Sequence, residues 1–146
     1  MTLTVEIVRD ASGELLSSLN VLLPQLSDSA LPLSISDLER LVASDSSTLF
    51  VAREGDLVVG SLTLVVFSLP SGPRAWIEDV VVDSRFRGRG AGERLTATAI
   101  EEARRRGVRT LDLTTRPSRD AANRLYQRMG FVRRETNVYR FFIESL

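Results

Sequence analysis

The sequence predicts an α/β protein with a mixed central sheet of about seven strands flanked by four helices. Strand patterns and helix patterns alternate along most of the chain, which is typical of a sheet covered by helices. One stretch, residues 74–103, joins a buried strand to a glycine-rich turn and then to a helix. The chain has 146 residues, of which 43% are apolar, so it is long enough to form one domain with a substantial core. We therefore expect a single domain over residues 1–146.

The N-terminal part predicts one strand followed by two helices. Residues 4–8 have strand character, and leucines at helical spacing predict a first helix with Ser12 as its cap. Pro24 is expected to kink or end that helix. A second, shorter helix is expected to start at Ser36 or Asp37.

Three strands come next in the predicted order. Residues 49–53 and 57–67 form a hairpin through the Glu-Gly-Asp turn at residues 54–56. Within it, Gly60 marks a bulge or a close approach of another segment. Residues 74–82 contain aromatic and β-branched residues that suit a strand buried on both faces. This strand is the expected centre of the sheet.

The C-terminal half continues the alternation of helices and strands. A helix with small apolar residues on one face is expected to end at Gly107. A strand over residues 109–115 and a helix over residues 119–129 follow. Residues 131–134 and 137–143 are expected to close the sheet as two further strands.

The turn between the central strand and the next helix is dense in glycine and arginine. Such glycines let the backbone approach a ligand, and the unpaired N–H groups of the new helix point at an anion there. A Rossmann fingerprint does not fit, because the sixth position counted from Gly88 is Glu93. A P-loop does not fit either, since no Lys-Ser or Lys-Thr pair follows. The turn predicts a pyrophosphate cradle made of Arg87, Gly88, Arg89, Gly90, Ala91 and Gly92.

Two motifs in the C-terminal half of the chain, taken together, resemble those of a known family. Residues 87–92 match R-x-x-G-x-G after a strand with an acidic pair, which resembles the acetyl-coenzyme A motif of the GNAT N-acetyltransferase superfamily. Residues 111–131 are similar to the second half of that family's core: a strand, a short loop, and a helix with Asn and Tyr that ends at Gly-Phe. The resemblance covers about residues 48–142. It implies an acetyl-coenzyme A-dependent N-acetyltransferase whose sheet splays at the central, cofactor-binding strand.

The resemblance also implies which residues bind the cofactor. Backbone groups of Val80, Val81 and Val82 would pair with the pantetheine arm if the central strand splays there, and one N–H would face the thioester oxygen. Ordinary strand pairing on both sides of these valines is the alternative. The cradle would hold the pyrophosphate. Asn123 matches a position that often hydrogen-bonds the pantetheine arm or the pyrophosphate.

Acid–base roles follow from the chemistry and from the resemblance. An alkyl amine with a pKa of about 10.4 is almost wholly ammonium at neutral pH, so some group must take its proton. Glu78 is the candidate base, directly or through a water, with Asp79 in reserve because a bulge would change which carboxylate faces the site. Tyr126 matches the tyrosine that protonates the departing thiolate in many members. The alternatives are an ion pair for Glu78 and a core position for Tyr126.

Composition excludes several kinds of chemistry. The chain has no cysteine and no histidine, which excludes a thiol nucleophile, a His-centred triad and the usual zinc sites. We expect no metal, and direct attack of the amine in a ternary complex. The N-terminus lacks signal-peptide features and no apolar run could span a bilayer, so a cytoplasmic protein with no membrane partner is expected. All 19 basic residues are arginine, which fits a GC-rich bacterial genome.

Charge is unevenly distributed along the chain although its sum is zero. Residues 1–73 hold three arginines against nine acidic residues, and residues 74–146 hold sixteen against ten. A basic half could bind nucleic acid, but a cofactor with several phosphates would also attract these arginines. Residues 104–106 fit a solvated helix end near Glu101 and Glu102. No nucleic-acid partner is expected, because five aromatic residues of this half have core-like spacing: Tyr126, Phe131, Tyr139, Phe141 and Phe142.

The sequence leaves the acceptor open. The segment between the first two helices lines the acceptor site in similar proteins, and acidic residues such as Asp28, Asp37 and Asp45 lie in or near it here. Acidic side chains suit a small cationic amine or a peptide or protein amino group, while helix caps and solvated faces are the alternative for each. Residues 77–82 also resemble a strand of glucosamine-phosphate acetyltransferases, although a sugar phosphate would need arginines in this wall.

A function of another class is a non-catalytic acyl-coenzyme A sensor or regulatory module. In that case the cradle would be intact and the candidate acid and base would have no chemical role. Retained binding without turnover of any amine would distinguish this module from an enzyme. A homodimer is compatible with the resemblance, but no residue pattern in the sequence marks an interface.

Overall fold

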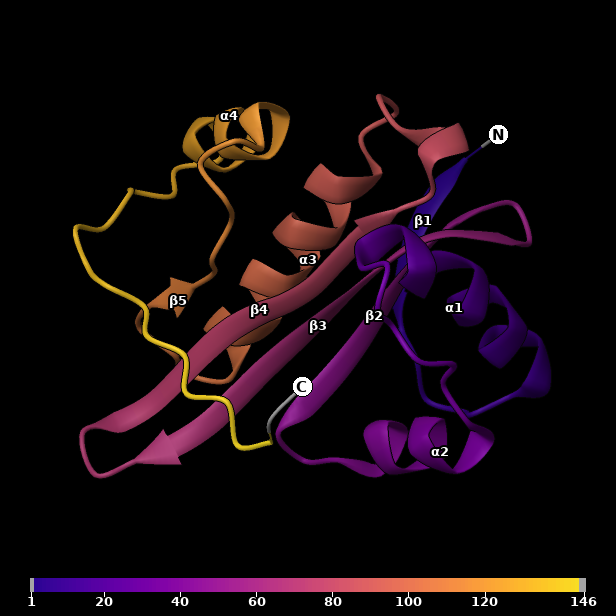
Figure 1. Ribbon diagram of the computed structural model, residues 1–146, viewed down its shortest axis with the longest axis horizontal. Coiled ribbons are helices and arrows are strands. Elements are labelled where there is room, and N and C mark those ends of the chain that lie inside the picture. The colour runs from indigo at the N-terminus through magenta and orange to yellow at the C-terminus, as the bar shows by residue number, and fades with distance from the viewer. Residues whose placement is uncertain (1, 145–146) are drawn as a thin grey trace. The chain divides into compact units, whose positions relative to one another are not determined.

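The computed structural model describes residues 2–144, which fall into two compact units. Unit 1 is Met1–Thr114 and unit 2 is Thr115–Leu146. Unit 1 holds five strands, β1 to β5, and the helices α1 to α3, whereas unit 2 holds α4 (Figure 1). None of the helices between residues 2 and 144 is long and apolar enough to cross a membrane.

The sheet of unit 1 is mixed, as the sequence predicts. Its strand order is β1-β2-β3-β4-β5, and every neighbouring pair is antiparallel except the last, in which β5 is parallel to β4. The strands are β1 (Leu3–Ile7), β2 (Ser47–Glu54), β3 (Leu57–Leu69), β4 (Gly72–Val82) and β5 (Leu111–Asp112). The expected α/β fold is therefore confirmed.

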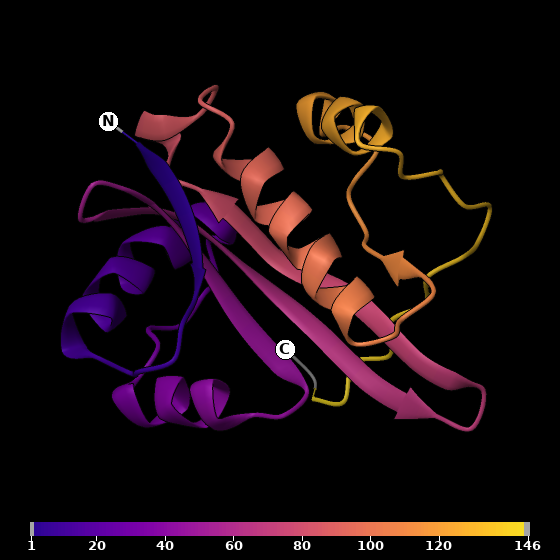
Figure 2. The ribbon, with the colours of Figure 1, turned by 180° about the vertical axis from the view of Figure 1, so that it is seen from behind.

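Helices cover both faces of this sheet. The helices α1 (Gly13–Leu26) and α2 (Ile35–Ala43) lie on one face, and α3 (Ala91–Arg105) lies on the other (Figures 1 and 2). The core on the α1 face brings leucines of both helices onto Val81 of β4. Burying such side chains fully stabilises the fold by about 1.5–3 kcal/mol each.

The ends of the first two helices follow local capping rules. The Ser12 hydroxyl accepts a hydrogen bond from a backbone N–H of the first turn of α1, which confirms it as the cap. Pro24 lies inside α1, and the helix ends two residues later. The start of α2 is earlier than expected, because Ser34 rather than Ser36 or Asp37 caps it. Ser34 and Asp37 form a reciprocal capping box.

Gly60 is a point of close approach, as its place in the sequence predicts. A Cβ atom at Gly60 would lie 3.0 Å from the carbonyl oxygen of Val81 and 3.2 Å from Cδ1 of Leu95. The register of β2 and β3 also shifts beside it, between Ala52 and Arg53. Glycine at this position thus lets α3 and β4 pack tightly against β3.

Unit 2 differs most from the sequence prediction. The helix α4 (Asp120–Arg128) is confirmed, but residues 131–134 and 137–143 form no strand, so the described sheet has five strands rather than about seven. The strand expected over residues 109–115 is only Leu111–Asp112. The core positions that aromatic spacing indicated are wrong for three residues of this tail, Tyr139, Phe141 and Phe142, which are 88%, 84% and 63% exposed.

Candidate active site

One edge of β4 is open over half of its length. The parallel strand β5 pairs with β4 only at Ala75 and Trp76. Beyond Trp76, among the described residues, the ladder of β4 continues with β3 alone, up to Val82. This loss of pairing is what the expected splay at the central strand requires. The free side of the strand leaves backbone groups that an extended ligand can pair with, as an added strand would.

A β-bulge interrupts β4 at its acidic pair. The register with β3 slips between Ser61 and Thr63, so that two residues of β4, Asp79 and Val80, oppose a single residue of β3. Asp79 has a φ of 52°, the left-handed conformation that few residues other than glycine adopt. The sequence predicts that successive side chains of this strand alternate between the two faces of the sheet. The extra residue reverses the faces on which the residues after it lie.

The bulge decides which face Glu78 occupies. Glu78 lies opposite Thr63 and Val81 lies opposite Ser61. Because alternate residues of β3 share a face, Glu78 and Val81 also share one, the face covered by α1 and α2. Trp76, two residues before Glu78, lies on the same face. Glu78 and Asp79 are both exposed, whereas Trp76 is half-buried.

The cradle follows β4 and the short 3-10 helix η1 (Ser84–Phe86). Gly88 and Gly90 have left-handed φ values of 78° and 86°, which glycine adopts without strain. Apart from the adjoining residues of the chain, no atom of residues 2–144 lies within 4 Å of where a Cβ of either residue would be, so the space beside the backbone is open. Gly90 caps α3 and makes no side-chain capping bond. The helix therefore presents an N-terminus suited to a phosphate.

The arginines of the cradle behave differently from one another. Arg87 is exposed, and its Nε donates to the carbonyl oxygen of Val82 at 3.4 Å. Arg89 instead turns its side chain to Glu54, with Nη1 3.0 Å from Oε1. The side chain of Arg89 is thus directed at Glu54, and contact of Arg89 with a ligand stays a prediction. Nothing in the sequence pairs Glu54 with Arg89.

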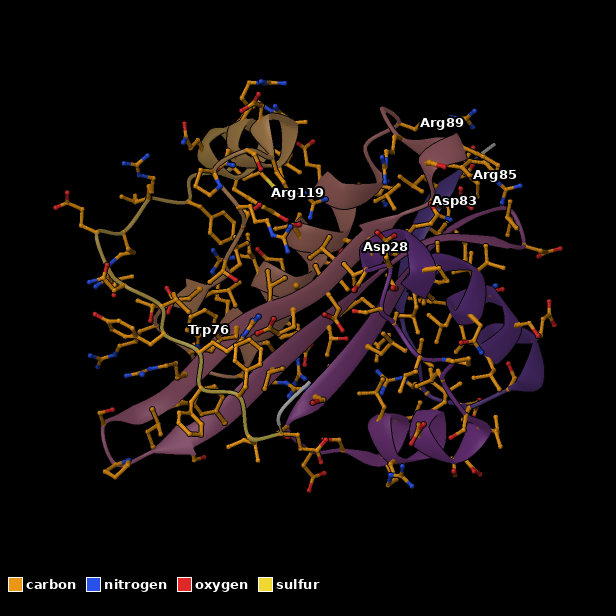
Figure 3. All side chains as sticks on the ribbon, viewed as in Figure 1. Asp28, Trp76, Asp83, Arg85, Arg89 and Arg119 are labelled. Atoms are coloured by element: carbon orange, nitrogen blue, oxygen red, sulfur yellow. The ribbon has the colours of Figure 1, made fainter. Side chains whose placement is uncertain are left out.

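A second ion pair fixes the start of the cradle. Asp83 is 2% exposed and accepts hydrogen bonds from the backbone N–H, Nε and Nη2 of Arg85. Hydrogen bonding to the Arg85 side chain holds the pKa of the Asp83 carboxyl below its usual value. Figure 3 shows Asp83, Arg85 and Arg89 gathered about the turn between β4 and α3. Sequence reasoning missed Asp83, although an aspartate just before a turn is a capping signal.

Asn123 of unit 2 has a local structural role. Its Nδ2 donates to the carbonyl oxygens of Arg116 and Arg119, at 3.0 and 2.8 Å, and so holds the turn that precedes α4. Its Oδ1 has no donor among the described residues. A contact of Asn123 with the cofactor stays a prediction, and Oδ1 is the atom that would make it.

Tyr126 of unit 2 is half-buried and packs against Phe131. The two rings meet edge to face, with centroids 5.6 Å apart. Burial raises the pKa of the Tyr126 hydroxyl above 10, and the charge of Arg119 opposes this effect. The hydroxyl is consequently protonated at neutral pH, as a general acid must be.

The acidic residues near the proposed acceptor wall divide into two kinds. Asp37 belongs to the capping box of α2 and pairs with Arg40, so the structural alternative holds for it. Asp28 lies exposed in the connection between α1 and α2 (Figure 3). Of the other arginines in residues 1–73, Arg53 is paired with Glu6.

Comparison with known proteins gives one family. The acetyltransferase (GNAT) family model matches residues 16–131. The glucosamine 6-phosphate N-acetyltransferase 1 of Oryza sativa subsp. japonica is 33% identical over 102 residues, which are 70% of this chain and 58% of that protein. The chain thus spans less than two thirds of the length of the curated relatives that it matches.

Solved structures share the fold over nearly the whole chain. A putative acetyltransferase from Agrobacterium tumefaciens str. C58 has a TM-score of 0.84 and 26% identity, covering 95% of this chain and 99% of that one. The aminoglycoside N-acetyltransferase AAC(6')-Iy, solved in complex with CoA, has a TM-score of 0.81, covering 97% and 95%, and its 19% identity shows the fold alone. The family match and the shared fold show that the chain belongs to the acetyltransferase (GNAT) family.

Proposed function

We propose that this protein is an acetyl-coenzyme A-dependent N-acetyltransferase that acts on a primary amine. The observation that carries this proposal is the unpaired edge of β4, which leads to the N-terminus of α3, where the cap residue Gly90 makes no side-chain hydrogen bond. A long ligand with amides at one end and a pyrophosphate at the other matches that order of groups. Family membership supports the reaction class.

The proposed binding residues are described for each unit by itself. In unit 1, the open backbone of Val80 to Val82 pairs with the pantetheine arm, and the cradle, residues 87–92, holds the pyrophosphate through backbone N–H groups. In unit 2, Asn123 is the proposed contact with the cofactor, and Oδ1 is its acceptor atom that the described residues leave free. The glycines fit this role, because the space where their side chains would lie is open.

Glu78 is the proposed general base. It is exposed on β4, beyond the last residue of β4 that pairs with β5. Among the described residues, Glu78 forms no ion pair. Glu78 takes one proton from the ammonium group, directly or through a water, and the neutral nitrogen then forms the new C–N bond. The nitrogen loses its second proton to solvent as the amide forms. Asp79, displaced by the bulge, stays in reserve for this role.

Tyr126 is the proposed general acid. As the C–S bond of the thioester breaks, its hydroxyl protonates the departing thiolate. The raised pKa keeps this proton in place at neutral pH. The substrate supplies the activated acetyl group, and the chain has no cysteine to hold it, so transfer is direct.

The acceptor of the proposal is a small cationic amine or a peptide or protein amino group. Glu78 and Asp79 give the open strand two exposed carboxylates, and Trp76 adds an aromatic side chain on the face of Glu78. Aromatic rings and carboxylates both attract cations. Of the three arginines in residues 1–73, Arg40 and Arg53 are already paired with carboxylates, which leaves Arg9 as the remaining basic side chain there for a sugar phosphate.

The test is release of free thiol from acetyl-coenzyme A with a panel of amines. The panel contains a polyamine, an aminoglycoside, a peptide with a free N-terminus and glucosamine 6-phosphate. We expect the cationic amines or the peptide to stimulate release, and the sugar phosphate to do so least. Preferred use of the sugar phosphate would overturn the acceptor assignment. Binding of acetyl-coenzyme A without turnover of any amine would make the protein a non-catalytic sensor.

A further inference from the structure

The side chain of Arg89 leaves the cradle that its backbone helps to form. Its Nη1 lies 3.0 Å from Oε1 and 3.2 Å from Oε2 of Glu54. The same guanidinium lies over the ring of Phe86, with Cζ 5.0 Å from the ring centroid. These contacts lie within unit 1 and join the middle of the cradle to the end of β2 and to η1.

Glu54 is a nearly buried carboxylate. Its side chain is 11% exposed, compared with 55% for Arg89. A carboxylate removed from water needs a charged or hydrogen-bonding partner, so this contact is more firmly determined than an ion pair at the surface. Among the described residues, Arg89 is the basic group that pairs with Glu54.

The cradle needs such an anchor because of its glycines. Gly88 and Gly90 flank Arg89, and glycine has the greatest backbone freedom of all residues. The start of the turn is fixed separately, since Asp83 caps η1 and binds Arg85. A loop that must become ordered when its ligand binds loses affinity, whereas a loop ordered in advance does not.

We propose that Glu54 is a positioning residue of the cradle. Through Arg89 it holds the backbone N–H groups of residues 88–92 in their binding arrangement before acetyl-coenzyme A arrives. This inference rests on the proposed function. It adds a residue that the motif does not contain, 35 positions away in the sequence, at the end of β2. In this role Arg89 acts by its contact with Glu54 and not as a ligand of the phosphates.

The first test compares three variants by calorimetry and steady-state kinetics. Glu54→Gln is expected to weaken acetyl-coenzyme A binding about tenfold, within the usual range for coupled neighbours, while kcat stays within about twofold. Arg89→Gln has the same effect, and the double variant is no weaker than either single one. Glu6→Gln, the matched control, removes the carboxylate that pairs with Arg53 and leaves the affinity unchanged.

A second readout needs no ligand. Amide hydrogen exchange of residues 88–92 is expected to be faster in Glu54→Gln and Arg89→Gln than in the parent, and unchanged in Glu6→Gln. If Glu54→Gln unfolds, the exchange rates of Arg89→Lys and Arg89→Gln decide whether the contact with Glu54 orders the cradle. The exposed side chain of Arg89 can change without collapse of the core. Lysine keeps the charge, and is expected to restore most of the affinity lost in Arg89→Gln.

The outcomes separate this inference from the proposed function. Parent-like binding and exchange in Glu54→Gln would overturn the positioning role. Tighter binding in Glu54→Gln with weaker binding in Arg89→Gln would also overturn it, since Arg89 would then contact the phosphates itself. If the parent does not bind acetyl-coenzyme A, the proposed function fails, while the exchange rates still decide whether Glu54 orders the cradle.

Discussion

Two side chains with different surroundings carry the proposed proton transfers. Glu78 is exposed on the unpaired edge of β4, where a substrate can reach it. Tyr126 is half-buried against Phe131, and its raised pKa keeps the hydroxyl proton. The two roles therefore predict different dependences on pH, which variants of each residue can separate.

Glu78→Gln is expected to lower turnover by about a hundredfold at pH 7, a typical value for a general base. The loss should shrink toward pH 10, where an alkyl amine loses its proton without help. Asp79→Asn is the matched control, because asparagine tolerates the left-handed backbone at this position. A pH–rate profile of each variant tests the assignment. Parent-like activity of Glu78→Gln together with an inactive Asp79→Asn would transfer the role to Asp79.

Tyr126→Phe is expected to lower kcat by about a hundredfold with little change in KM, since the ring stays packed and only the acidic proton is lost. The loss should persist from pH 6 to pH 9, because the pKa of the hydroxyl lies above 10. Tyr139→Phe, at an exposed position, serves as the control. Steady-state kinetics at saturating amine measure both. An unchanged kcat in Tyr126→Phe would leave Tyr126 with a packing role alone.

Among the structural elements, β4 depends most on one irregular position. The bulge at Asp79 and Val80 puts Glu78 and Val81 on one face and so aims Glu78 toward the side covered by α1 and α2. The left-handed φ of Asp79 stores the strain of this arrangement. Side-chain size at this residue should therefore affect stability even though the residue is exposed.

Asp79→Val is expected to lower the free energy of unfolding by about 1–2 kcal/mol, because a β-branched residue fits the left-handed region poorly. Asp79→Gly should stay within about 1 kcal/mol of the parent, since glycine relieves the strain but frees the unfolded chain. Urea unfolding of both variants measures the difference. Equal stability of the two would show that the bulge imposes no conformational demand on this residue.

Local signals predicted most elements and the glycine turn between β4 and α3. The hairpin, the Ser12 cap and the strand–glycine–helix order each depend on residues close together in the chain. The bulge and the Arg89–Glu54 contact do not, because they depend on strand register and on a partner 35 residues away. The strands expected in residues 131–143 failed for a related reason. Strand-forming residues indicate an extended chain. A strand also requires a neighbour to pair with, and the residue types of the segment do not identify that neighbour.

In the molecule as a whole, ion-paired side chains at the end of α3 join this helix to the sheet. Glu102 accepts hydrogen bonds from Arg105 and Arg106, and Arg106 also donates to the Thr48 hydroxyl on β2 at 2.8 Å. The hydrogen bonds from Arg105, with those from Arg106, lower the pKa of Glu102 from 4.5 to about 2. The expected solvated helix end is therefore also an attachment of α3 to the sheet.

Acid should weaken this attachment. A carboxyl whose pKa is lowered by folding stabilises the fold above its unfolded value of 4.5, and this contribution is lost as pH falls toward about 2. Glu102→Gln should therefore be less stable than the parent at pH 7 by about 1–2 kcal/mol, and the gap should narrow at pH 3. Glu101→Gln, which alters an exposed pair, is the control. A constant gap between pH 7 and pH 3 in urea unfolding would contradict this account.

The most direct test of the central claim is a calorimetric titration of acetyl-coenzyme A into the protein. We predict saturable binding at one site with a dissociation constant of about 1 μM to 1 mM, the usual range for enzyme substrates. Gly92→Glu should abolish binding by adding charge at the N-terminus of α3. Ala97→Glu, which adds the same charge at an exposed position of that helix, should bind like the parent. No binding by the parent, or unchanged binding by Gly92→Glu, would contradict the assignment of the cradle.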